Sequence, residues 1–132
     1  MDLIGKISKA ELEVMKILWS EKKPVSFTDI RVRLSSSKGW NKSTINTLIR
    51  RLSEKGAINS RKLDKLYYTS NISEEEYVRT EEQDLLDKLY DGSAKNFVAA
   101  LYRRGTLSKE DIDELREYFR MEVTKCEDTD ME

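Results

Sequence analysis

The fold is decided by residues 40–56, which read WNKSTINTLIRRLSEKG. Their aliphatic side chains recur at intervals of three, one and three residues, at Ile45, Leu48, Ile49 and Leu52. At about 100° per residue, these four positions form one narrow apolar stripe along a helix. Gly56 follows, and glycine is common just past a helix end because it tolerates a left-handed conformation. The spacing predicts an amphipathic helix that begins near Asn41 or Ser43 and ends at Gly56.

The rest of this helix carries hydroxyl, amide and cationic groups, at Lys42, Ser43, Thr44, Asn46, Thr47, Arg50 and Arg51. Asparagine can pair with adenine, arginine with guanine or phosphate, and serine and threonine with base edges or phosphates. A helix also fits the DNA major groove. The alternative is an ordinary solvated face, which is usually rich in Glu and Lys, and only Glu54 and Lys55 have that character. We interpret this segment as a DNA-recognition helix.

Two further helices are marked before this segment. Residues 8–11, Ser-Lys-Ala-Glu, have the capping-box pattern and predict a helix to about Ser20. Residues 26–29, Ser-Phe-Thr-Asp, begin a shorter helix that ends in the polar run 35–39. Trp19 and Trp40 are expected to pack in the core rather than to serve a site.

After the segment, residues 57–71 have strand-forming ends around a short basic middle. They predict a β-hairpin with its tip near Lys62–Lys65, in which Tyr67 and Tyr68 serve packing. The turn type stays open, because no Asn-Gly or Asp-Gly pair is present. The basic residues Arg61, Lys62 and Lys65 suit contacts with DNA phosphates. Protection of an edge strand is the alternative, and beside a recognition helix we favour DNA.

Three helices are predicted in the second half, at about 73–90, 94–104 and 108–123. Their apolar stripes have few other elements to cover them, which favours burial against a second copy of the chain. The expected dimerisation residues are Leu85, Leu86, Leu89, Phe97, Leu101, Ile112, Leu115 and Phe119. Residues 124–132 are polar and acidic and are expected to be disordered.

The predicted fold is therefore mainly α with a small β-hairpin wing. An N-terminal winged helix-turn-helix spans residues 1–72, and a C-terminal helical dimerisation domain spans residues 73–123. Charge divides in the same way. Residues 1–72 carry 15 basic and 7 acidic side chains, a net of +8, whereas residues 73–132 carry 9 and 18, a net of −9. A basic half that binds a polyanion explains this division, and a chance split of two solvated surfaces is the alternative.

Several classes of site are disfavoured. The chain has no histidine and one cysteine, Cys126, so we expect no zinc or other metal site, no cofactor and no disulfide framework. The lack of histidine also removes the commonest general base, so we expect no enzyme. Residues 1–6 precede no apolar signal core, and no run approaches the roughly 20 apolar residues of a membrane span. We expect a cytoplasmic protein without membrane insertion.

These residues resemble the BlaI/MecI/CopY repressors of bacterial antibiotic-resistance and copper operons. Residues 7–19 (ISKAELEVMKILW) are similar to the opening of those repressors. Trp40, Thr44–Ile45, Thr47–Ile49, Arg51–Leu52 and Lys55–Gly56 resemble their recognition helix. Their dimerisation segment is similar to residues 89–93, Leu107–Ser108, Ile112 and Glu114–Leu115, and the likeness covers about residues 7–120.

The resemblance implies a homodimer that blocks transcription at operators built from TACA/TGTA inverted repeats. In the β-lactam branch, a membrane sensor-protease pathway leads to cleavage of the repressor at an Asn-Phe bond. That bond aligns here with Ala100-Leu101, and an Asn96-Phe97 pair lies one turn earlier. The copper branch carries a Cys-x-Cys tail, whereas this chain has only Cys126, which disfavours copper sensing.

The function expected from these features is sequence-specific repression by a dimer on a double-stranded DNA operator. The alternative is a winged-helix adaptor that binds proteins and does not read DNA, since a fold alone does not determine function. A carboxylate-based hydrolase has neither supporting spacing nor a glycine-rich loop in this sequence.

Overall fold

The computed structural model describes residues 6–130, with side chains as far as Thr124. The chain forms two compact units. The first unit ends at Glu82, and the second unit begins at Gln83, so the division falls inside one helix. No helix within residues 6–130 is long and apolar enough to cross a bilayer.

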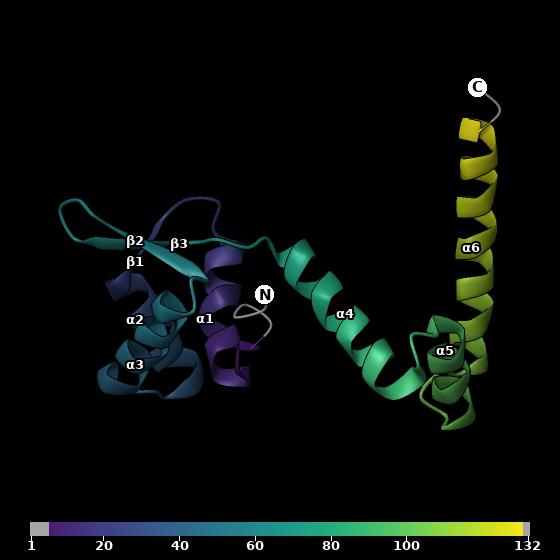
Figure 1. Ribbon diagram of the computed structural model, residues 1–132, viewed down its shortest axis with the longest axis horizontal. Coiled ribbons are helices and arrows are strands. Elements are labelled where there is room, and N and C mark those ends of the chain that lie inside the picture. The colour runs from purple at the N-terminus through teal and green to yellow at the C-terminus, as the bar shows by residue number, and fades with distance from the viewer. Residues whose placement is uncertain (1–5, 131–132) are drawn as a thin grey trace. The chain divides into compact units, whose positions relative to one another are not determined.

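The first unit contains the three predicted helices and the predicted hairpin (Figure 1). Its elements are α1 (Lys9–Ser20), β1 (Val25–Ser26), α2 (Phe27–Lys38), α3 (Lys42–Glu54), β2 (Ile58–Lys62), β3 (Leu66–Ser70) and the start of α4 (Glu74–Tyr90). The three strands form an antiparallel sheet in the order β1-β3-β2. Tyr68 is the central residue of this sheet, because Val25 pairs with it on one side and Ser60 on the other.

Side-chain caps fix where the first three helices begin. The Ser8 hydroxyl accepts from the backbone N–H of Glu11 at 3.1 Å, and the Glu11 carboxylate accepts in return from the Ser8 N–H at 2.9 Å. Ser26 and Asn41 cap α2 and α3 in the same way, with oxygens 3.1 and 2.8 Å from the N–H three residues on. Replacing such a cap by alanine typically costs about 0.5–2 kcal/mol of stability.

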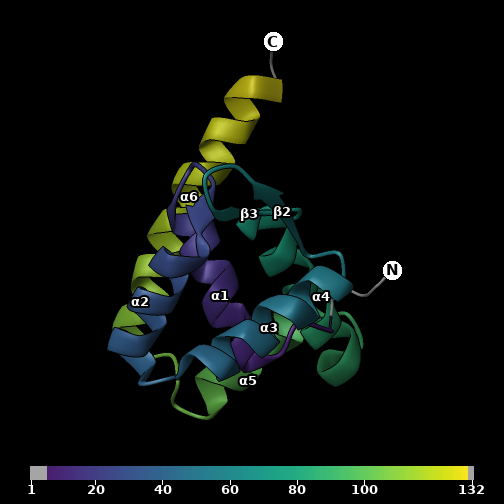
Figure 2. The same ribbon diagram turned by 90° about the vertical axis from the view of Figure 1, so that its left-hand side faces the viewer.

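One core holds the first unit together. It is built mainly from side chains with at most 5% of their surface exposed, namely Val14, Met15, Leu18, Val25, Ile30, Leu34, Ile45, Leu48, Ile49, Leu52, Ala57 and Ile58. Most of these side chains come from α1, α2 and α3, which lie on one side of the sheet (Figure 1 and Figure 2). Burying each of the larger side chains contributes about 1.5–3 kcal/mol. All four residues of the α3 stripe are in this core, which leaves the opposite side of α3 facing away from it.

The second unit contains the rest of α4, α5 (Ala94–Arg103) and α6 (Lys109–Asp130). Among its described residues, Ala100 is the only buried apolar one. The rings of Tyr90 and Phe97 pack 5.2 Å apart, and Arg104 donates to the Tyr90 hydroxyl at 3.0 Å. Of the expected dimerisation residues, Leu89 and Phe119 are 62% and 56% exposed, Leu85 is 38% exposed, and the other five are half-buried.

The C-terminal end corrects one expectation. Helix α6 continues to Asp130 instead of ending at about Val123, so it extends into the segment 124–132 that was expected to be a disordered tail. No glycine or proline follows Gly105, and Lys and Glu favour helix, so nothing in the sequence interrupts the helix after Val123. Residues 131–132 lie outside the described residues.

Candidate nucleic-acid interface

The outward side of α3 carries the residues that the sequence singled out. Lys42, Ser43, Thr44, Asn46, Arg50 and Arg51 are exposed, and Thr47 is half-buried. The Thr47 hydroxyl donates to the backbone carbonyl of Ser43 at 3.0 Å, so it is engaged within its own helix. Arg50 lies 3.4 Å from Glu54 in an exposed pair, which contributes at most about 0.5 kcal/mol. Its guanidinium can therefore leave Glu54 for a base or phosphate at little cost.

Three elements meet in one hollow beside this face. It has a volume of about 340 Å³ and is lined by Phe27, Thr28, Lys42, Asn46, Lys65, Leu66 and Tyr68. The hollow joins the first turns of α2 and α3 to the wing, as we call residues 58–70, whose tip projects away from the helices (Figure 1). Lys42, Asn46 and Lys65 are distant in sequence and lie together here. Two ammonium groups in one hollow attract an anion such as a phosphate.

Thr28 belongs to this hollow and was missed by the sequence analysis. It lies in the first turn of α2, directly after the cap formed by Ser26. A helix N-terminus presents backbone N–H groups and a partial positive charge that favour anions. The recognised cap at residues 26–29 marked this position, but only the folded structure brings it beside Lys42 and Lys65.

The wing cations do not all lie together. Arg61 and Lys62 are both exposed, but they are neighbours on β2 and therefore point to opposite faces. Arg61 lines a separate hollow of about 330 Å³, with Pro24, Leu63 and Tyr67 among the other lining residues. Partial burial and the nearby Asp64 carboxylate raise the pKa of Tyr67 above its ordinary value.

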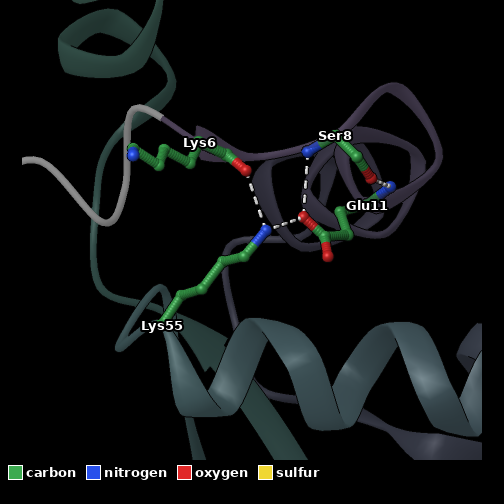
Figure 3. A network of polar contacts seen from close by, with 4 residues as sticks. All are labelled: Lys6, Ser8, Glu11 and Lys55. Carbon is green, nitrogen blue, oxygen red and sulfur yellow. Dashed lines mark hydrogen bonds and ion pairs between the residues drawn. The ribbon is translucent and has the colours of Figure 1, made fainter.

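A buried ion pair anchors the end of α3 (Figure 3). The Lys55 ammonium bonds to a carboxylate oxygen of Glu11 and donates to the Lys6 carbonyl at 2.8 Å. Glu11 is only 2% exposed, and Lys55 is 24% exposed. Burial raises the pKa of Glu11, but the hydrogen bond and charge of Lys55, with the bonds of Ser8, outweigh it and leave that pKa below its ordinary value.

This ion pair departs from the expectation that Lys55 belongs to a solvated helix end. The capping box identified Glu11, yet it gave no sign that a side chain 44 residues further on would reach it. The pair joins the C-terminal end of α3 to the N-terminal end of α1. Helix α3 is thus held by its buried stripe and by its end, which fixes the direction of its polar face.

Comparisons with known proteins agree with this architecture. A family model described as "Penicillinase repressor" matches residues 7–121. The penicillinase repressor of Bacillus licheniformis is 35% identical over 116 residues, 87% of this chain and 90% of that protein. The penicillinase repressor of Staphylococcus aureus is 38% identical over 112 residues, 84% of this chain and 88% of that protein.

Two further matches extend the comparison. The methicillin resistance regulatory protein MecI of Staphylococcus aureus strain N315 is 36% identical over 111 residues, 83% of this chain and 89% of that protein. The solution structure of the DNA-binding domain of the repressor BlaI is 40% identical with a TM-score of 0.52, covering 58% of this chain and 94% of that domain. The chain therefore belongs to the penicillinase repressor family.

Proposed function

We propose that this chain is a dimeric transcriptional repressor that binds an inverted-repeat DNA operator. The observation that carries the proposal is α3, which buries its four aliphatic residues and turns Asn46 and Arg50 outward beside a cationic wing. The similarity to repressors along most of the chain supports it, as does the match to a repressor's DNA-binding domain.

In this proposal α3 lies in the major groove, and each half-site takes one copy. Asn46 and Arg50 read bases, because their amide and guanidinium groups can bond to two positions on a base edge. Lys42, Lys65 and Thr28 hold a phosphate in the hollow that they line, and Arg61 and Lys62 hold phosphates on the two opposite faces of the wing. Ser43, Thr44, Thr47 and Arg51 complete the surface that faces DNA.

The second unit supplies the dimer. More of its large apolar side chains are exposed than in the first unit, and Leu89, Phe119 and Met121 are all more than half exposed. Exposed apolar side chains on both α4 and α6 favour an interface, and a typical stable interface buries about 800 Å² on each partner. The half-sites would then lie about one helical turn apart, or a multiple of it.

The family places this function in regulation of antibiotic resistance, and we extend that to the chain itself. It acts in the cytoplasm, where the DNA lies, and it has no enzymatic activity of its own. A membrane sensor-protease pathway delivers the inducing signal. The Asn96-Phe97 bond and the aligned Ala100-Leu101 bond both lie inside α5, so either would need local unfolding of that helix before cleavage.

Gel shifts on a duplex with a TACA/TGTA inverted repeat test the proposal. Specific complexes typically form about 10³-fold more tightly than complexes with random DNA. Arg50→Ala should cost about 1–3 kcal/mol on the repeat and much less on a shuffled sequence. Arg79→Ala is the matched control, since Arg79 forms the same kind of exposed pair, with Glu75 at 3.6 Å, on α4.

Two results would contradict the proposal. Equal losses on specific and shuffled DNA would remove Arg50 from base reading. A chain that is not retained on a DNA column even at low salt would favour the protein-binding adaptor instead.

A further inference from the structure

The indole of Trp19 ties the first turn of α4 to the end of α1. Its N–H donates to the backbone carbonyl of Ile72 at 2.9 Å and lies 3.2 Å from the Ser70 hydroxyl oxygen. That hydroxyl also donates to the Ile72 carbonyl, at 2.5 Å, and accepts from the Ile72 N–H at 3.2 Å. Ser70, the last residue of β3, and Ile72, in the link to α4, are thus both bonded to the Trp19 side chain, more than 50 residues earlier in the sequence.

The ring of Trp19 also packs directly against α4. Its centroid lies 5.5 Å from that of Tyr77, with the ring planes inclined at 39°. Tyr77 is 7% exposed and is the only buried residue of α4, whereas residues 78–82 are all exposed. Figure 1 shows α4 beginning beside the end of α1. Within the first unit, therefore, α4 is anchored by its first turn, through Tyr77, and not by residues 78–82.

A helix held at one end acts as a lever. Helix α4 has 17 residues, and at 1.5 Å per residue its length is about 25 Å. From Tyr77 to Tyr90 the helix rises about 20 Å, so a tilt of about 10° at Tyr77 would move the far end by about 3.4 Å, which equals the rise of one DNA base pair. A small change at the Trp19 contact is large on the scale by which half-sites are spaced.

We propose that Trp19 is a positioning residue that sets which half-site spacing the repressor dimer accepts, by fixing the direction in which α4 leaves the winged helix. This inference rests on the proposed function, because spacing has meaning only for a dimer on two half-sites. Ordinary core packing does not explain the contact fully. The indole N–H is bonded to the connecting segment itself, and the ring faces the helix that leads to the second unit.

The test measures affinity on a series of duplexes in which the spacer between two TACA/TGTA half-sites grows or shrinks one base pair at a time. The full-length chain should lose about tenfold or more in affinity per step away from its best spacer, because the DNA must twist or bend to fit. Trp19→Phe removes the N–H donor, and Tyr77→Leu removes the stacked ring. Each should flatten the profile to about threefold or less per step, with unchanged affinity for a single half-site.

Two controls separate positioning from general stability. Tyr77→Phe keeps the ring contact and should keep the steep wild-type profile. Val14→Ala removes packing from the core, where Val14 is fully buried, without touching the joint. It should lower the melting temperature and leave the spacing preference unchanged. Melting curves of Trp19→Phe and Tyr77→Leu show whether both are folded at the temperature of the binding assay.

The outcomes are distinguishable. If the wild-type chain prefers one spacer and both joint variants keep that preference, the inference is overturned while the proposed function stands. The inference is also overturned if Val14→Ala flattens the spacing profile as much as Trp19→Phe and Tyr77→Leu do. If the wild-type chain binds no inverted repeat at any spacing, the proposed function fails, and the inference fails with it.

Discussion

The two units of this chain differ in how completely they bury their apolar residues. The first unit closes a core of fully buried aliphatic side chains around α3, whereas the second buries only Ala100 among its described residues. Both units have clear helix caps, so the difference does not come from helix formation. It comes from the number of elements available to cover each stripe. The comparison shows that the first unit buries its own apolar residues, whereas those of the second unit would be buried only in the proposed dimer.

The largest effect is expected from the core of the first unit. Leu52→Ala removes a side chain that is completely buried in α3, and such truncations cost about 2–5 kcal/mol. Urea unfolding followed by tryptophan fluorescence measures it, because both tryptophans, Trp19 and Trp40, are in the first unit. Val32→Ala is the control, since Val32 is 55% exposed and should change stability by less than about 0.5 kcal/mol. If Leu52→Ala and Val32→Ala lowered the free energy of unfolding equally, the buried core would not be what stabilises the first unit.

The second unit should respond to truncation through association rather than folding. Leu89→Ala should weaken the dimer by about 1–3 kcal/mol, because Leu89 is exposed until a second copy covers it. Sedimentation at several protein concentrations gives the dissociation constant. Leu63 is a matched leucine in the wing, 58% exposed against 62% for Leu89. Leu63→Ala should leave association unchanged, and a dimer indifferent to Leu89→Ala would show that α4 is not in the interface.

A smaller effect is expected when one lysine is removed from either half of the chain, and it should differ between the two halves. Lys62 lies in the half with a net charge of +8 and Lys88 in the half with −9, and both are exposed. Either substitution by alanine lowers the net charge equally. Only Lys62→Ala should weaken binding to all DNA sequences alike and reduce the slope of log affinity against log salt by about one. Salt titrations of both variants measure this, and equal slopes would indicate a long-range effect of net charge.

The smallest effect is expected from pH and is confined to the acid range. The pKa of Glu11 is below its ordinary value of 4.5 when folded, because the bonds and charge of Lys55 and Ser8 outweigh the burial that raises it. Its stabilisation is therefore complete above about pH 4.5 and is lost as the pH falls through the folded pKa. Glu11→Gln cannot titrate, so its stability should fall less steeply than that of the wild-type chain below pH 4.5.

Urea midpoints measured from about pH 5 downward give that slope, since an ordinary Glu carboxyl titrates near pH 4.5 and the pKa of folded Glu11 lies below that value. Lys55→Met should remove much of the same pH dependence by removing the cation. Glu117→Gln is a control in the second unit, where Glu117 lies 2.5 Å from Arg120 in an exposed pair that contributes little at neutral pH. Parallel slopes for the wild-type chain and Glu11→Gln would show that the buried pair does not govern the acid response.

Features set by neighbouring residues were predictable from the sequence. The cap at Ser8 and the stripe on α3 depend on spacings of three and four residues, so the pattern alone was enough, whereas it left the start of α3 open between Asn41 and Ser43. The β-hairpin of the wing was predictable because strand-forming residues flank a short basic segment. The residues on the outward face of α3 were predictable too, because the positions outside the buried stripe must face the solvent.

Features set by packing between distant segments were not predictable. The two-residue strand β1 exists only because Val25 and Ser26 meet β3, and so brief a strand has no alternation to detect. Thr28 joins the hollow only after α2, α3 and the wing assemble. The contacts of Lys55 with Glu11 and of Trp19 with Ile72 span 44 and 53 residues. Each depends on interhelical geometry, which local spacing does not encode.

In the proposed dimer, the exposed apolar stripes of the second unit would make the amount of this protein part of its own regulation. On the proposed dimer, the paired form grows with the square of the monomer level whenever that level is below the dissociation constant. Halving the number of copies per cell would then leave about a quarter of the pairs, by the same mass action. Growth that outpaces synthesis would release the controlled genes more sharply than a monomeric regulator allows.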